Sequence, residues 1–129
     1  MTELSHMTRE DEAARERLQA ATAAMQARTC AWSDVNTGSW NTDGLKAFSA
    51  DLANAFSELK GDVRLQESPG FETIDSSGKS ETIYTGPIVR VSARPSAPIQ
   101  VVMTGHYDTV FPKGTFEGVK DIGNGMLNG

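Results

Sequence analysis

Residues 99–110 read Ile-Gln-Val-Val-Met-Thr-Gly-His-Tyr-Asp-Thr-Val, and this stretch decides the fold that the sequence predicts. Its first part, residues 99–103, is a nearly continuous apolar run, which is typical of a strand covered on both faces of a sheet. A polar segment with a glycine and a histidine follows directly. Because ligands in an open α/β sheet sit beyond the carboxyl ends of the strands, we expect a functional site within residues 104–110.

His106 and Asp108 are the residues in this segment that can carry chemistry. One residue separates them, so an extended backbone points both side chains to the same face. In one interpretation, a neutral imidazole binds a divalent metal ion while Asp108 accepts a hydrogen bond from the other ring nitrogen, which fixes the tautomer. In the other, His106 is a buried polar residue satisfied by the backbone and Asp108 caps a turn. The spacing alone leaves both interpretations open.

Two helices are predicted upstream of this stretch. Thr8 and Asp11 form a capping-box pattern, and a segment rich in helix-forming residues continues to Arg28. A turn-rich connector follows at residues 33–39. Beyond it, apolar residues at spacings of three and four predict a second helix, which Gly61 is expected to close at the C′ position. These apolar residues are Leu45, Phe48, Leu52, Phe56 and Leu59.

After Gly61 the hydrophobic period changes to two, which predicts strands. A short strand is expected from Val63, ending at Pro69 and Gly70. A hairpin is expected between residues 71–74 and 82–85, and a further strand at 88–93. Two helices followed by strands, with a buried strand late in the chain, favour a layered α/β domain with a mixed sheet.

Composition narrows the function classes. The chain has 129 residues, enough for one domain, and 12 basic against 17 acidic residues give a net charge of −5. An acidic chain without a basic run argues against nucleic-acid binding. No apolar stretch is long enough for a membrane span, and no secretory signal is visible. A single cysteine, Cys30, excludes an internal disulfide, so we expect a cytoplasmic protein.

The ends of the chain differ from its middle. Residues 1–8 are expected to form a disordered tip, and residues 111–129 a glycine-rich loop that can include a short hairpin. Gly123 and Gly125 indicate a glycine-rich turn rather than a phosphate cradle, because no strand–turn–helix pattern surrounds them. A domain rarely ends so openly after its most buried strand, so we expect the chain to be the N-terminal part of a larger domain.

The remaining notable residues receive structural interpretations. His6 is expected to be solvated, and Cys30 to be a buried or half-buried thiol without a catalytic role. Trp32 and Trp40 are expected to pack at the helix–sheet edge, with substrate contact as the alternative. The charged run at residues 10–17 is expected to be a solvated helix face. Tyr107, which projects opposite to its neighbours, is expected to pack.

The string at residues 101–112 resembles the first metal-binding motif of the co-catalytic zinc exopeptidases and deacylases. That group includes carboxypeptidase G, acetylornithine deacetylase, succinyl-diaminopimelate desuccinylase and the aminoacylases. The family pattern is an apolar strand, a small residue, Gly or Ser, and then His-X-Asp-Thr/Val-Val. Residues 113–116 and 123–129 also resemble the family, whereas the match upstream of residue 101 is looser.

The resemblance implies an incomplete three-layer α/β catalytic domain of a zinc-dependent amide hydrolase. His106 would be a ligand of one of two zinc ions, with cobalt or manganese as substitutes. Asp108 would belong to the catalytic centre as the group that holds His106. Two-metal-activated water would attack the amide of a peptide or N-acyl amino acid, and a glutamate outside this chain would move the proton. The complete protein could form a homodimer through a separate domain that this chain lacks.

Because a catalytic zinc takes about three protein ligands, the isolated chain is expected to be inactive. Two other classes stay open. One is a non-catalytic α/β interaction module in which His106 and Asp108 are structural. The other is a nucleotide binder that uses the glycine-rich tail.

Overall fold

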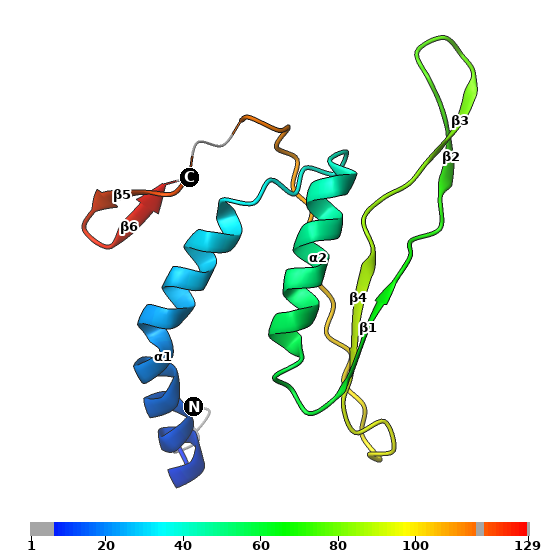
Figure 1. Cartoon of the computed structure of the whole chain (residues 1–129). Coiled ribbons are helices and arrows are strands. Elements are labelled where there is room, and N and C mark those ends of the chain that lie inside the picture. The colour runs from blue at the N-terminus through cyan, green and yellow to red at the C-terminus, as the bar shows by residue number, and fades with distance from the viewer. Residues whose placement is uncertain (1–6, 116–117, 129) are drawn as a thin grey trace, which may run out of the picture. The chain divides into compact units, whose positions relative to one another are not determined.

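The computed structural model describes residues 7–115 and 118–128. The chain divides into two units, Met1–Ser33 and Asp34–Gly129. It is a mixed α/β chain of two helices and small two-stranded antiparallel sheets (Figure 1). No helix in the described ranges combines the length and apolar character that crossing a membrane requires. His6 and most of the predicted N-terminal tip lie outside the described residues.

The first unit is the helix α1, Arg9–Ser33. The predicted capping box is confirmed: the Thr8 hydroxyl accepts from the Asp11 N–H at 3.2 Å, and Asp11 Oδ2 accepts from the Thr8 N–H at 2.8 Å. The helix runs five residues past the predicted end at Arg28. The Arg28 guanidinium lies 5.8 Å from the centre of the Trp32 ring, a cation–π contact within the extra turn. No residue of α1 is buried, so its charged run is solvated as predicted.

The helix α2, Thr42–Phe56, opens the structured part of the second unit. Asn41 caps it by accepting from the Gly44 N–H at 3.2 Å. Leu45 and Phe48 are the buried apolar side chains of the described residues. The helix ends before the predicted Gly61, so the C′ role assigned to that glycine is wrong. Ser57 closes the helix instead, with its N–H bonded to Ala53 and its hydroxyl to Asn54.

The two predicted strands are confirmed as β1, Asp62–Gln66, and β4, Ile88–Ser92, although β1 ends at Gln66, before the predicted end at Pro69 and Gly70. They pair antiparallel, with Val63 opposite Val91 and Leu65 opposite Val89. Both strands contact α2 (Figure 1). This small helix-on-sheet layer is where the core lies, since Leu45 and Phe48 both come from α2.

The predicted hairpin is also confirmed, as β2, Phe71–Ile74, paired with β3, Ser80–Ile83. Asp75 builds its turn: Asp75 Oδ1 accepts from the N–H groups of Ser77 and Lys79 at 2.8 and 2.9 Å. These backbone hydrogen bonds lower the pKa of Asp75. A second hairpin, β5, Lys120–Gly123, with β6, Met126–Asn128, confirms the expectation for the tail. Asn124 and both flanking glycines of its turn have positive φ.

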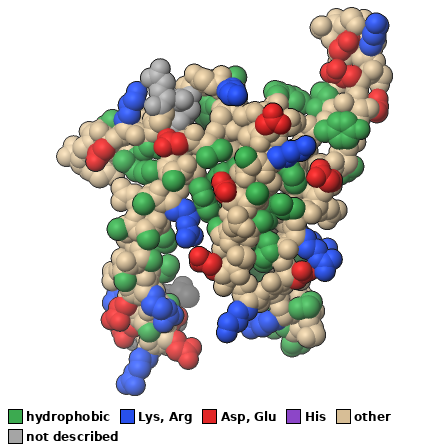
Figure 2. Space-filling view, viewed as in Figure 1, with side chains coloured by type: hydrophobic (Ala, Val, Ile, Leu, Met, Phe, Trp, Pro, Cys, Tyr) green, Lys and Arg blue, Asp and Glu red, His purple; other side chains and the backbone are tan. Residues whose placement is uncertain are grey.

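The predicted strand at residues 99–103 is wrong. The segment forms no strand, and its apolar side chains are exposed, Val102 by 85% and Met103 by 92%. The sheets are all antiparallel, so the predicted mixed sheet is not formed either; the parallel pairing in the described residues is an isolated bridge of Gly38 with Thr109. A strand needs a hydrogen-bonding neighbour and a covering layer, and no described segment supplies them to 99–103. Figure 2 shows further hydrophobic side chains at the visible surface.

Candidate metal centre

The segment that carries His106 is held by the connector at residues 36–41. The Ser39 N–H donates to the Thr109 carbonyl at 3.0 Å, and the Thr109 N–H donates to the Thr37 carbonyl at 2.8 Å. Gly38 pairs with Thr109 between these bonds. A Cβ on Gly38 would lie 2.5 Å from the Phe111 carbonyl oxygen, so only glycine permits this approach. Residues about 70 apart in sequence are thereby fixed side by side.

Asn36 provides a second set of hydrogen bonds to the segment that follows His106. Its Nδ2 donates to the carbonyls of Phe111 and Pro112 at 3.2 and 3.3 Å, and its Oδ1 accepts from Asn41 Nδ2 at 2.9 Å. Asn41 in turn caps α2. One amide therefore links the helix start to the segment after His106. The sequence marked residues 33–39 only as turn-forming, because asparagine in a turn is common and its long-range partner is not encoded locally.

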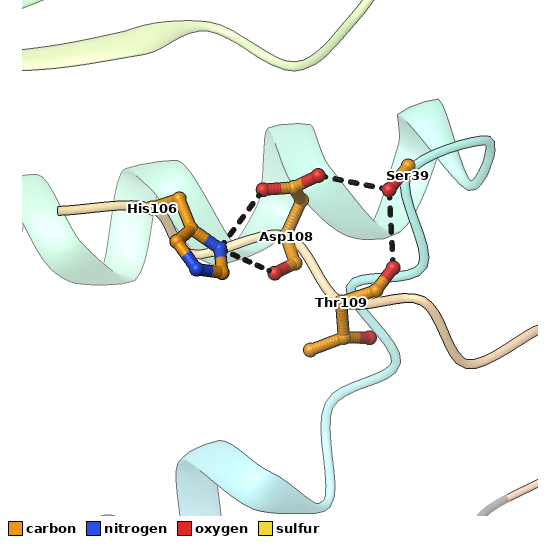
Figure 3. Close-up of polar contacts among 4 residues, drawn as sticks. All are labelled: Ser39, His106, Asp108 and Thr109. Carbon is orange, nitrogen blue, oxygen red and sulfur yellow. Dashed lines mark hydrogen bonds and ion pairs between the residues drawn. The ribbon is translucent and has the colours of Figure 1, made fainter.

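The structure brings His106 and Asp108 together. His106 Nδ1 lies 3.3 Å from Asp108 Oδ1 and 3.0 Å from the Asp108 carbonyl oxygen (Figure 3). With Nδ1 as the donor, Nε2 keeps its lone pair on the opposite side of the ring. The His106 side chain is 85% exposed. The arrangement therefore presents a ring nitrogen to solvent and fixes the other one against an oxygen.

Ser39 completes this chain of contacts and was missed in the sequence. Its hydroxyl donates to Asp108 Oδ2 at 2.8 Å and lies 3.1 Å from the Thr109 carbonyl (Figure 3). The Asp108 carboxylate thus touches His106 with one oxygen and Ser39 with the other. A serine in a turn-rich connector gives no signal of this role, because its partner lies 69 residues away.

Tyr107 lies on the other side of this segment, as predicted, and packs. Its ring centre is 6.1 Å from that of Phe48, and its hydroxyl donates to the Pro87 carbonyl. Burial raises the pKa of Tyr107. Because side chains alternate between the two faces of an extended segment, the packed Tyr107 leaves His106 and Asp108 on the opposite face, toward solvent.

A surface hollow of about 490 Å³ adjoins the site through Ser39 and Thr109. Trp40, Phe111 and Lys113 line it, whereas His106 does not. Trp40 is 70% exposed, so the expectation that it packs is wrong. The neighbouring residues Ser39 and Asn41 make the hydrogen bonds of the connector, whereas Trp40 lines the hollow.

His106 and Asp108 fit zinc as one ligand and its holder, not as a complete centre. Among the described residues, no group of three or more His, Cys, Asp or Glu side chains is arranged to hold a metal ion. Cys30 is partly buried, as predicted. Gly123 and Gly125 lie at the turn between β5 and β6, as predicted, and the described segment after this turn is a strand rather than a helix whose N-terminus would bind phosphate.

Removing the Ser39 hydroxyl is expected to loosen Asp108. Ser39→Ala deletes one hydrogen bond to a charged acceptor, so we expect a loss of about 1.5–3 kcal/mol in the free energy of unfolding and a shift of the His106 ring-nitrogen NMR signals. Ser77→Ala is the matched control, since the Ser77 hydroxyl donates to Asp75 Oδ1 at 2.7 Å away from His106. Equal His106 shifts in both variants would contradict the role of Ser39.

The comparisons with known proteins gave no match to this chain among protein-family models, curated proteins or solved structures.

Proposed function

We propose that the chain is the N-terminal part of a zinc-dependent amide hydrolase, in which His106 is a ligand of one zinc ion. The observation that carries the proposal is the orientation of the imidazole: Nδ1 faces Asp108 and the rest of the ring is in solvent. Metal-binding histidines commonly give their second nitrogen to a carboxylate or a carbonyl. Asp108 offers both groups to the same nitrogen.

Zinc would supply a Lewis acid that activates water and polarises the amide carbonyl. The residues of this chain would orient the first ligand: Ser39 holds Asp108, and Asp108 holds His106. The remaining ligands and the general base would come from outside the described residues, because these hold no further donor cluster.

The exposed apolar run supports a larger domain around this chain. Residues 99–103 carry side chains that soluble domains normally bury, and four of them are 80–92% exposed. In the proposed three-layer catalytic domain, this run is a strand between neighbours that the described segments do not provide. The His106 site would then follow the carboxyl end of that strand.

The proposed substrate is a peptide or an N-acyl amino acid. The hollow beside Ser39 supports this class, since Trp40 and Phe111 offer apolar surface and Lys113 offers a cation for a carboxylate. By the resemblance of residues 101–112, a separate domain of the whole protein could form a homodimer.

A non-catalytic interaction module is the second candidate, and one observation favours it. The Ser39–Asp108 hydrogen bond ties two distant segments, which a purely structural aspartate also does. In that case His106 is dispensable and its replacement changes neither folding nor any metal affinity.

A zinc titration of the 129-residue chain, followed by NMR of both histidines, separates these candidates. We expect weak, saturable binding that shifts the His106 ring signals, is lost in His106→Ala and weakens about tenfold in Asp108→Asn. His6→Ala is the control and should leave the titration of His106 unchanged. Zinc shifts that are absent, or that follow His6 rather than His106, would contradict the proposed ligand.

A further inference from the structure

The β1–β4 sheet has one apolar and one charged face. Alternation along the two strands places Val63 and Val91 on one face and Arg64 and Arg90 on the other. Arg64 and Arg90 are direct cross-strand partners. Like charges opposite one another destabilise a strand pair, so this pairing needs a counter-charge.

The counter-charge within the described chain is incomplete. Arg64 Nε contacts Asp62 Oδ2 at 2.5 Å. No carboxylate of the described residues lies within ion-pair distance of Arg90, Lys60 or Arg94. These three exposed cations therefore have no counter-charge from the described residues.

These side chains surround a surface hollow of about 450 Å³. Lys60, Arg64, Arg90 and Arg94 line it together with a single carboxylate, that of Asp62. The whole chain carries a net charge of −5, so four cations around one hollow oppose its overall charge. Such a concentration attracts small anions from solution.

Arg94 reaches the hollow through an unusual backbone conformation. Its φ is 49°, in the left-handed region that few residues other than glycine adopt. The turn after it holds this conformation, because the Arg94 carbonyl accepts from the Ala97 N–H at 3.0 Å and from Gln100 Nε2 at 3.2 Å. Backbone of this kind is concentrated at functional sites.

We propose that this hollow binds the diphosphate group of a small molecule. Guanidinium groups bind phosphate oxygens through paired N–H donors, and three arginines with one lysine match a multiply charged anion better than a single carboxylate. The site is independent of His106 and of the proposed hydrolase activity, since the two share no residue.

Calorimetric titration of the 129-residue chain with pyrophosphate at low ionic strength tests the proposal. We expect one saturable site with weaker binding of inorganic phosphate. Arg90→Gln should weaken pyrophosphate binding about tenfold or more, whereas Asp62→Asn should strengthen it, because the variant frees Arg64 and removes a negative charge. Arg17→Gln, which makes the same charge change at a residue that does not line the hollow, should weaken binding clearly less than Arg90→Gln does.

Circular dichroism of each variant checks its folding, and the gain expected for Asp62→Asn cannot arise from unfolding. Absence of pyrophosphate binding, or equal losses in Arg90→Gln and Arg17→Gln, would overturn the proposal. Preferred binding of a single-stranded oligonucleotide with the same dependence on Arg90 would overturn the assignment to a small molecule.

Discussion

Leu45→Ala is expected to unfold the 34–129 unit at room temperature or to bring it close to unfolding. Leu45 is 2% exposed and, with Phe48, makes up the buried apolar core of the described residues. Leucine-to-alanine substitutions in a core cost about 2–5 kcal/mol. A whole domain is stable by only about 5–15 kcal/mol, and a core of two buried apolar side chains belongs at or below the low end. The cavity would therefore remove most of the stability.

Urea unfolding followed by tyrosine fluorescence measures this effect, because Tyr107 packs on Phe48 and reports on the same layer. Leu18→Ala is the matched control: Leu18 is 60% exposed on α1, so its loss should change the free energy of unfolding by less than about 0.5 kcal/mol. Similar midpoints for both variants would show that the core lies elsewhere.

If the proposed function is right, His106→Ala abolishes metal-dependent amide hydrolysis in the larger protein that the proposal requires. Replacing a residue that only orients a metal ligand costs about 10–100-fold in metal affinity or activity. That range is the expectation for Asp108→Asn, and loss of the ligand itself should exceed it. The 129-residue chain should show no turnover with added zinc or cobalt, because a catalytic zinc needs about three protein ligands.

Hydrolysis of N-acyl amino acids, measured by release of the free amine, tests both variants beside His6→Ala. The His6 variant should keep full activity. A reading frame that ends at residue 129, or hydrolysis that survives His106→Ala, would contradict the proposed function.

The local elements of this protein follow from its sequence. The capping box at Thr8 and both hairpins are predicted because their signals lie within a few residues of one another. The end of α2 was placed too late for the same reason: apolar spacing continues to Leu59, but the chain turns at Ser57 toward its place in β1. The spacing of apolar residues indicates which side chains prefer burial, but it does not indicate at which residue the helix ends.

In the candidate site, too, the contacts between residues close in sequence could be predicted, whereas the contacts between distant segments could not. The spacing of His106 and Asp108 predicts that they share a face, and one intervening residue is enough to decide it. Ser39 and Asn36 join the site only through partners about 70 residues away, so no local pattern indicates them.

The sequence by itself determined that two helices and two hairpins form and that the imidazole lies beside its carboxylate, because short-range spacing controls all of these features. Only the tertiary structure shows that residues 99–103 are exposed and that Ser39 donates a hydrogen bond to Asp108. It alone also brings Lys60, Arg64, Arg90 and Arg94 together around one hollow. The physical reason is that burial and charge clustering depend on which distant segments meet. An apolar run becomes a covered strand only where another strand and another layer reach it.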